Sequence, residues 1–389
     1  MTSNHHPSRR ASQAAPFIVM DVLRSAGELA AAGADIIHME VGQPFGAAPR
    51  KVIEAAHAAL DGHDLGYTQA HGILPLRERI ARYYEEKHSL SIDPERIFVT
   101  TGSSGAFTIA FLTAFDAGDR VGLANPGYPA YRNIFHALDI TPELIPAGAA
   151  QGWSPDAAGV KARMAAGMKG LLVASPANPT GAMLDGQRLG ALVESVEASG
   201  GVFISDEIYH RLEYSMPAHT ALEYSANAIV INSFSKYYCM TGWRIGWMVM
   251  PEHLVRTAEI LAQNMFINAP AIAQYAAIAA FDADDELERR KEEYARNRAF
   301  LIDALPQAGF PSFAPPDGAF YVYCDVSHLT DDSFELARRI LHETHVAVTP
   351  GLDFDPVDGR RFLRFSFCAS HQDIQRAMER LARWRQKAR

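Results

Sequence analysis

Short apolar runs alternate with helix-like segments through the middle of the chain. Each run is nearly continuous in apolar residues and stops at a small or polar residue. Runs of this length predict strands that are buried on both faces. Their alternation with helices is typical of a mostly parallel sheet sandwiched between helices. The predicted strands cover residues 97–100, 120–124, 170–174, 202–205, 228–232 and 245–250.

The two ends of the chain show a different pattern of predicted helices and strands. The N-terminal part shows helical patterns and one short strand, at residues 19–32, 36–41, 49–60 and 74–86. The C-terminal part predicts a charged helix, a strand, a second helix and a second strand, at residues 284–304, 320–323, 333–344 and 361–367. We therefore expect an α/β fold, in which a smaller α+β domain begins near residue 285.

Composition excludes several classes of protein. The 389 residues carry a net charge of −9, which is not the basic footprint of a nucleic-acid binder. No apolar run approaches the roughly 20 residues that span a bilayer. The cysteines Cys239, Cys324 and Cys368 are few and far apart, which argues against a disulfide framework and favours a cytoplasmic protein. The histidines show no metal-ligand spacing, and residues 1–16 are predicted to form a disordered tail without a secretory signal.

The segment after the strand at 228–232 gives the strongest chemical signal. It reads Ser233-Phe234-Ser235-Lys236 and continues to Arg244. Most lysines are exposed, but Lys236 lies among apolar and aromatic residues. Desolvation there lowers the pKa of the amine, which makes the amine a usable nucleophile. The serines and the arginine are donors that suit a phosphate group.

Other strand ends carry polar or aromatic residues too. In parallel sheets, ligands bind beyond the carboxyl ends of the strands, so these residues are expected to meet. Alone, Asp206 could be a structural ion-pair partner or helix cap, and Asn178 a turn residue. Together they suggest a ligand with a phosphate, a flat ring, a ring cation, a ring oxygen and an electrophile. Pyridoxal 5′-phosphate has these features, which would be met by Ser103, Ser104, Tyr128, Asn178, Asp206, Tyr209, Ser233, Lys236 and Arg244.

At this point the sequence resembles the class I/II aminotransferases of the pyridoxal-phosphate fold-type I superfamily. The resemblance covers about residues 17–385. The matching motifs lie at residues 42–44, 67–68, 72–77, 178–181, 206–209, 233–246 and 361–366. It implies an arm at 17–48 that joins a small C-terminal domain at 286–389, and a large cofactor-binding domain at 49–285. The small domain would then be built from both chain ends.

The resemblance also implies roles for the residues that bind the cofactor. Lys236 would form the Schiff base and move the proton during catalysis. Asp206 would keep the ring nitrogen protonated, and Asn178 and Tyr209 would hydrogen-bond the ring oxygen. Tyr128 would stack on the ring. The phosphate would be held by Ser103, Ser104, Ser233 and Arg244, with Ser235 a weaker candidate.

Further implied roles concern the substrate and a second subunit. Arg364 would bind the substrate carboxylate in a bidentate fork, with Gly42 offering a backbone N–H; Arg360 and Arg361 fit that pattern less well. Asn178 would also face the substrate. Tyr67 would reach the phosphate of a partner subunit, which implies a homodimer with shared active sites. The expected reaction moves the amino group of an L-amino acid to a 2-oxo acid by a ping-pong route.

Two alternatives remain open on the sequence alone. A pyridoxal-phosphate C–S β-lyase or related eliminating enzyme would keep the same site residues. A ligand-sensing domain of a transcription regulator would carry a DNA-binding module before the domain, and the resemblance starts too early for one. Some dicarboxylate-specific relatives carry a basic residue at the position of Ser104, so we expect a neutral amino donor here.

Overall fold

A seven-stranded sheet forms the centre of the large domain, in a computed structural model that describes residues 6–387. The strand order is β2-β8-β7-β6-β5-β3-β4, and only β8 runs antiparallel to its neighbours. The strands are β2 (Ile97–Thr100), β3 (Arg120–Asn125), β4 (Thr141–Pro146), β5 (Gly170–Ala174), β6 (Val202–Asp206), β7 (Ile229–Ser233) and β8 (Gly246–Val249).

Both faces of this sheet are buried, as the continuous apolar runs predicted. Successive residues of one strand enter opposite cores: Phe203 packs in one hydrophobic cluster and Ile204 in the other. One face is covered by α5 (Gly102–Ala114), α6 (Pro129–Ala137) and α9 (Val255–Met265). The other is covered by α4 (Leu74–His88), α7 (Ala157–Ala165), α8 (Gly186–Glu197) and α10 (Ala271–Ala280), with α3 (Arg50–Gly62) packed outside α10.

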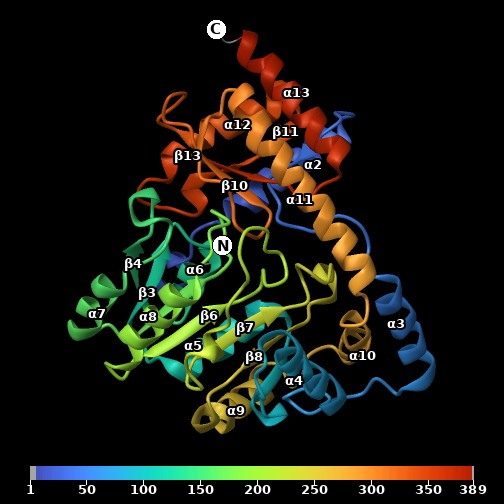
Figure 1. Ribbon diagram of the computed structural model, residues 1–389, viewed down its shortest axis with the longest axis vertical. Coiled ribbons are helices and arrows are strands. Elements are labelled where there is room, and N and C mark those ends of the chain that lie inside the picture. Colours follow the sequence, from blue (N-terminus) through green and yellow to red (C-terminus); the bar gives the residue numbers. More distant parts are fainter. Residues whose placement is uncertain (1–5, 388–389) are drawn as a thin grey trace, which may run out of the picture.

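The small domain combines both ends of the chain, as predicted. In Figure 1 the blue helix α2 (Ile18–Ala31) lies among orange and red elements at the top of the molecule. Strand β1 (Ile37–His38) pairs in parallel with β11 (Val346–Ala347), some 309 residues later. An antiparallel sheet of order β12-β13-β10-β9 completes the domain, with β9 (Ser312–Phe313), β10 (Tyr321–Asp325), β12 (Thr349–Pro350) and β13 (Phe362–Ser366).

Helices pack around these small sheets and connect the two domains. Helix α11 (Asp284–Gln307) begins at the predicted boundary near residue 285 and packs against α13 (His371–Lys387). Helix α12 (Ser333–Thr344) covers β11 and β12. The precise residue limits of the domains stay predictions. None of the helices within residues 6–387 is long and apolar enough to cross a membrane.

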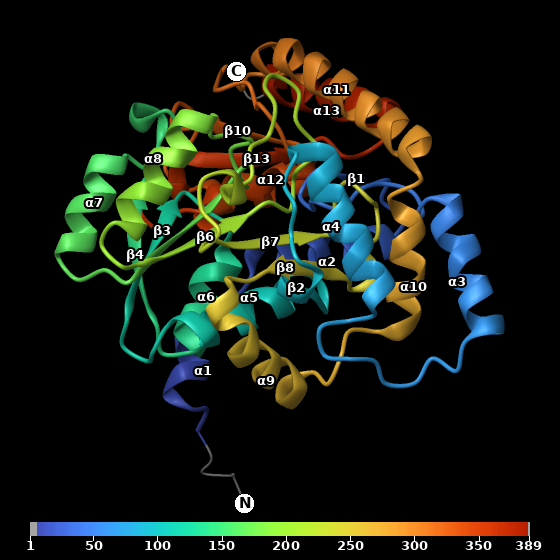
Figure 2. The same cartoon turned by 60° about the horizontal axis from the view of Figure 1, so that its bottom comes forward.

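The structure corrects part of the sequence-based expectations. Within the predicted tail, residues 9–13 form helix α1 (Arg9–Gln13) beside α6 (Figure 2). Arg9 pairs with Asp139 at 2.9 Å. Asp139 lies far along the chain, so no local sequence pattern predicts this contact. The strand expected at 36–41 shrinks to β1, and the sequence pattern does not predict edge strand β4. Residues 1–5 of the predicted tail lie outside the described part of the chain.

Candidate active site

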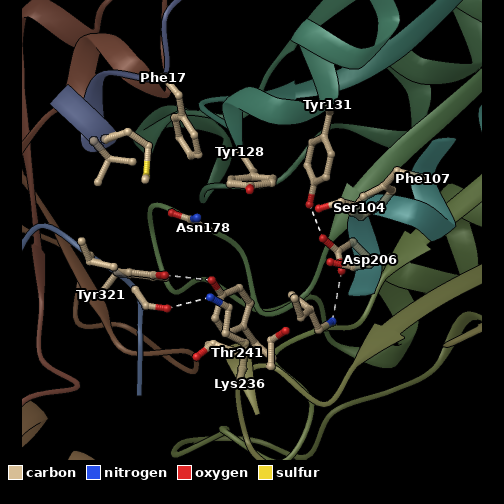
Figure 3. Close-up of a pocket in the computed structure, with 18 of the residues that line it drawn as sticks. Phe17, Ser104, Phe107, Tyr128, Tyr131, Asn178, Asp206, Lys236, Thr241 and Tyr321 are labelled. Carbon is tan, nitrogen blue, oxygen red and sulfur yellow. Dashed lines mark hydrogen bonds between the residues drawn. The ribbon is translucent and has the colours of Figure 1, made fainter. Parts of the chain in front are cut away.

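One cavity lies where the carboxyl ends of β5, β6 and β7 face the small domain. It is lined by polar residues from both domains and by apolar residues of the N-terminal arm (Figure 3). Most of the predicted site residues meet there. Those that line it are Gly42, Ser103, Ser104, Tyr128, Asn178, Asp206, Tyr209, Ser235, Lys236, Arg244 and Arg364.

Lys236 follows β7 and carries the amine of the cavity. Its Nζ donates a hydrogen bond of 2.6 Å to the carbonyl oxygen of Gly42 in the arm. Burial lowers the pKa of this amine to about 8, and the nearby Arg364 lowers it in the same direction. A substantial fraction of the amine is therefore neutral near pH 8, which is the form that attacks an electrophile.

Asp206 ends β6 and supplies the carboxylate of the cavity. The residue is 3% exposed and accepts hydrogen bonds from the Tyr131 hydroxyl and, at 3.1 Å, from the Ile208 backbone N–H. Burial raises the pKa of Asp206 to about 6, although the hydrogen bond from Tyr131 opposes the shift. No salt bridge pairs this carboxylate within residues 6–387, so a cationic ligand group would stabilise it.

An anion cradle faces these groups at the start of α5. The cap residue Thr101 makes no side-chain hydrogen bond to the helix, so the first N–H groups are not capped by it. Arg244 approaches the same turn: a Cβ built on Gly102 would lie 2.6 Å from Arg244 Nη2. Glycine at position 102, whose φ is +70°, is therefore required for this close approach. Free N–H groups at a helix start, beside a guanidinium, suit a phosphate.

Arg364 on β13 supplies a buried cation. It is 3% exposed, and its guanidinium lies between the Tyr321 and Phe354 rings, at 4.3 and 4.5 Å from their centroids. Nη1 donates to Asn178 Oδ1 at 2.8 Å, and Nη2 donates to the Glu40 carbonyl. Nε has no hydrogen-bond partner among the described residues, and no carboxylate pairs with Arg364 there. The arrangement therefore suits a ligand carboxylate.

A pair of tyrosines lies beside the amine and the arginine. The Tyr209 and Tyr321 hydroxyls lie 2.8 Å apart, and both rings line the cavity. Tyr128 stands on the opposite side, with its ring 5.8 Å from that of Phe17 in an edge-on contact (Figure 3). The cavity therefore offers an aromatic surface beside its charged groups. Its cations, Lys236, Arg244 and Arg364, outnumber its single carboxylate, so an anionic ligand is favoured.

Comparison with known proteins decides the family. Residues 34–381 match the family "Aminotransferase class I and II". The chain belongs to this family. Among its relatives is the valine–pyruvate aminotransferase of Mycobacterium tuberculosis, 44% identical over 95% of this chain and 96% of that protein. The (5-formylfuran-3-yl)methyl phosphate transaminase of Methanocaldococcus jannaschii is 33% identical over 96% of this chain and 98% of that one.

Solved structures agree with this aminotransferase in fold. An aminotransferase from Mycobacterium tuberculosis superposes with a TM-score of 0.95 at 43% identity, covering 98% of this chain and 99% of that chain. The Thermus thermophilus aspartate aminotransferase with maleate gives 0.92 at 30% identity, covering 97% and 99%. These relatives are named for amino transfer, so the lyase alternative gains no support from them.

Two predicted site residues of the aminotransferase do not line the cavity. Ser233 is 1% exposed, and its hydroxyl lies 2.9 Å from Ser235 Oγ and 3.2 Å from the Ile245 carbonyl. Ser235 stands at the cavity wall instead, because Ser233 still belongs to the buried strand β7. Tyr67 is 85% exposed and does not line this chain's own cavity.

Sequence reasoning missed several cavity residues. Tyr131 bonds Asp206 from helix α6, and Tyr321 comes from β10 in the other domain. The arm contributes Phe17, Val19 and Met20 because Asp353 fixes its start: the carboxylate accepts from the Ile18 and Val19 N–H groups at 3.1 Å each. The sequence signal for Tyr131 is its position two residues after Pro129, where helix α6 begins. Nothing local indicates the contacts of the arm.

Gly42 is predicted to be needed for full amino-transfer activity. A Cβ at this position would overlap Tyr321 Oη, so Gly42→Ala should displace Tyr321 and break its contact with Tyr209. We expect kcat/KM to fall by about tenfold or more, equivalent to about 1.4 kcal/mol. Gly27→Ala is the matched control, because an added Cβ there meets nothing within 4 Å. Equal kcat/KM for Gly42→Ala and Gly27→Ala would contradict this role of Gly42.

Proposed function

We propose that the cavity binds pyridoxal 5′-phosphate and transfers the amino group of a neutral L-amino acid to a 2-oxo acid. Class I and II aminotransferases are known to use this cofactor. The observation that carries the proposal is that one cavity holds a half-buried amine, Lys236, and a buried carboxylate, Asp206, beside an anion cradle. The cofactor has an aldehyde for the amine, a ring nitrogen for the carboxylate and a phosphate for the cradle.

The cofactor-binding roles follow from these positions. Ser103, Ser104, Ser235 and Arg244 would hold the phosphate at the start of α5. Asp206 would keep a proton on the ring nitrogen, because an ionised carboxylate in a buried site is stabilised by a cation. The Tyr131 hydroxyl and the Ile208 N–H would orient that carboxylate. Asn178 and Tyr209 would contact the ring oxygen, and Tyr128 would cover the ring face.

The catalytic roles belong to Lys236 and its neighbours. When bound, the cofactor supplies an aldehyde that takes up the amino group and a ring that withdraws electrons. Arg364 would bind the substrate carboxylate and thereby orient the Cα–H bond toward Lys236. Lys236 Nζ would remove the proton from Cα and return it to the neighbouring carbon during transfer. A flexible side chain with an amine of lowered pKa suits both steps.

The walls of the cavity favour a neutral side chain on the donor. The arm presents Phe17, Val19 and Met20, and Val41 and Ile208 add further apolar surface. Ser104 stands where some dicarboxylate-specific relatives carry a basic residue. Among the described residues that line the cavity, the cations are Lys236, Arg244 and Arg364, each with a role already proposed. The relative named for valine and pyruvate supports the same choice.

A homodimer would complete the phosphate site. Tyr67 is 85% exposed, and its loop is tied to the α9–α10 connection by the Thr68 N–H, which donates to Asn268 Oδ1 at 3.4 Å. The neighbouring Met265 and Ile267 are also exposed, at 44% and 47%. We propose that this surface binds a second copy of the chain and that Tyr67 contacts the phosphate bound by its partner.

The donor preference is tested by half-transamination. Adding a neutral aliphatic amino acid such as valine should convert the cofactor from its aldehyde to its amine form, followed by absorbance. We expect neutral donors to exceed aspartate and glutamate at least tenfold in kcat/KM, about 1.4 kcal/mol of discrimination. Pyruvate and 2-oxoglutarate serve as acceptors. A tenfold advantage for the acidic donors would refute the neutral class, and no conversion with any donor would refute amino transfer.

The role of Lys236 is tested by cofactor binding to the apo-protein. Only the neutral amine attacks the aldehyde, and its pKa is about 8. The rate of covalent binding should therefore rise about tenfold per pH unit below pH 8 and level off above it. Lys236→Ala should bind the cofactor without the absorbance of the covalent adduct. Retained turnover in Lys236→Ala would exclude the assignment.

Shared sites are tested by mixing two defective variants. Lys236→Ala lacks the amine, and Tyr67→Ala should bind the cofactor about tenfold more weakly through loss of one phosphate contact, about 1.4 kcal/mol. A mixed dimer would contain one site with both wild-type residues. We expect mixing to produce amino-transfer activity from sites that bind the cofactor with wild-type affinity. Sedimentation should show dimers. A monomer, or no recovery after subunit exchange, would count against the shared site.

A further inference from the structure

A buried acid lies directly behind the cofactor-facing carboxylate. The segment from Asp206 to His210 sends its side chains in two directions. Asp206, Ile208 and Tyr209 line the cavity, whereas Glu207 and His210 do not. Glu207 is 0% exposed and His210 is 4% exposed. Neither has a role in the amino transfer proposed above.

One oxygen of Glu207 is fully engaged. Oε1 accepts hydrogen bonds of 2.9 Å from the Thr220 hydroxyl and from the Ala221 N–H. The backbone N–H of Glu207 donates to the Ile231 carbonyl on β7 at 2.7 Å. The residue therefore ties the end of β6 to both the neighbouring strand and the turn at 220–223. Movement of this side chain would release the segment that carries Asp206 and Tyr209.

The other oxygen faces an imidazole, and both lack partners. Glu207 Oε2 makes no hydrogen bond in the described chain, and neither does His210 Nδ1. These two atoms lie 3.6 Å apart, slightly beyond hydrogen-bond distance. A buried polar atom without a partner is costly, and here two such atoms face each other. A single proton placed between them would satisfy both.

The surroundings decide which residue carries that proton. Burial, with a smaller contribution from the neighbouring His88, lowers the pKa of His210 to about 3. The imidazole is therefore neutral. Burial raises the pKa of Glu207 to about 8, against the hydrogen bonds from Ala221, Thr220 and Ser205. The next cation along the chain, Arg211, is engaged by Asp284 and Glu288 on α11 at 2.8 and 2.9 Å.

The remaining groups around Glu207 do not favour its ionisation. They come from α4, from the turn at 219–223 and from the strand end itself. Glu223 lies between His88 and His219, at 3.1 and 2.7 Å from their Nδ1 atoms. The titratable groups in this region include Tyr83, Tyr84, His88, Asp206, His210, His219, Glu223 and Tyr238. No group of three or more His, Cys, Asp or Glu within residues 6–387 could hold a metal ion.

We propose that Glu207 is a positioning residue that works as a neutral carboxylic acid, donating its Oε2 proton to His210 Nδ1. The neutral pair locks the segment 206–210 without a second negative charge beside Asp206. Asp206 then holds the only anionic charge at this strand end, available to the ring nitrogen. The link to the ring nitrogen rests on the proposed function, whereas the protonation state of Glu207 does not.

The proposal fixes the sign of a pH effect. The ordinary pKa of a glutamate is about 4.3 in an unfolded chain, and that of folded Glu207 is about 8. Between these values the folded state binds one proton more than the unfolded state. The stability from this proton is fully present below about pH 4 and is lost as the pH rises through 8. The unfolding equilibrium constant should therefore rise about tenfold per pH unit across this window, relative to a variant without the acid.

Glu207→Gln is the informative variant. The amide keeps an acceptor for Thr220 and Ala221 and offers an N–H to His210, so it reproduces the neutral acid. We expect kcat/KM within about threefold of wild type, whereas Glu207→Ala should lose at least about tenfold because it releases the segment. Urea denaturation from pH 5 to 8 should show the tenfold-per-unit difference between wild type and Glu207→Gln. Glu223→Gln, a nearby and partly exposed glutamate, should leave that wild-type slope in place.

Infrared spectroscopy of the holoenzyme observes the proton directly. The C=O stretch of a protonated carboxylic acid should be present at pH 7, be lost in Glu207→Gln and persist in Asp206→Asn and Glu223→Gln. Absence of the band in wild type, parallel pH slopes, or unfolding of Glu207→Gln would each overturn the proposal. These readouts do not depend on turnover. A failed amino-transfer assay would therefore refute the proposed function but would not bear on the protonation of Glu207.

Discussion

The site depends on keeping two opposite buried charges apart. Asp206 and Arg364 are each 3% exposed and line one cavity, yet each is held by neutral partners. Tyr131 and a backbone N–H bind the carboxylate, while Asn178 and a backbone carbonyl bind the guanidinium. If the two charges paired with each other, the cavity would lose its affinity for a ligand that carries both a cation and an anion. The neutral hydrogen-bond partners leave both charges available to such a ligand.

The two domains divide the chemistry between them. Strand ends of the large domain carry the amine, the carboxylate and the anion cradle on rigid, doubly covered elements. The small domain carries Arg364 on β13 and Tyr321 on β10, two strands that pair in register through Tyr323 and Arg364. The N-terminal arm closes the remaining side with apolar residues. In the proposed function, the small domain would thus bind the substrate carboxylate, the large domain would carry out the chemistry, and the arm would contact the substrate side chain.

Much of the fold and the site could be predicted because the information is local. Continuous apolar runs indicate doubly covered strands, and parallel strands bring their ends together, so the sequence alone groups Asn178, Asp206 and Lys236. Other features depend on partners far along the chain. The docking of residues 9–13 requires Asp139, and the apolar wall of the arm requires Asp353. Ser233 does not line the cavity for a finer reason: one residue decides whether a side chain ends inside a strand or at the cavity wall.

The pairing of β1 with β11 has a consequence for how the protein is made. Ile37 has its strand partner at Val346, so the arm that carries Gly42 has no place to dock until nearly the whole chain has left the ribosome. The large domain can assemble earlier, because its strands are closer together in sequence. During synthesis, the nascent large domain would hold an exposed amine and a cavity that the arm does not yet cover. The pairing of β1 with β11 is therefore a late and slow step, and the active site is complete only after it.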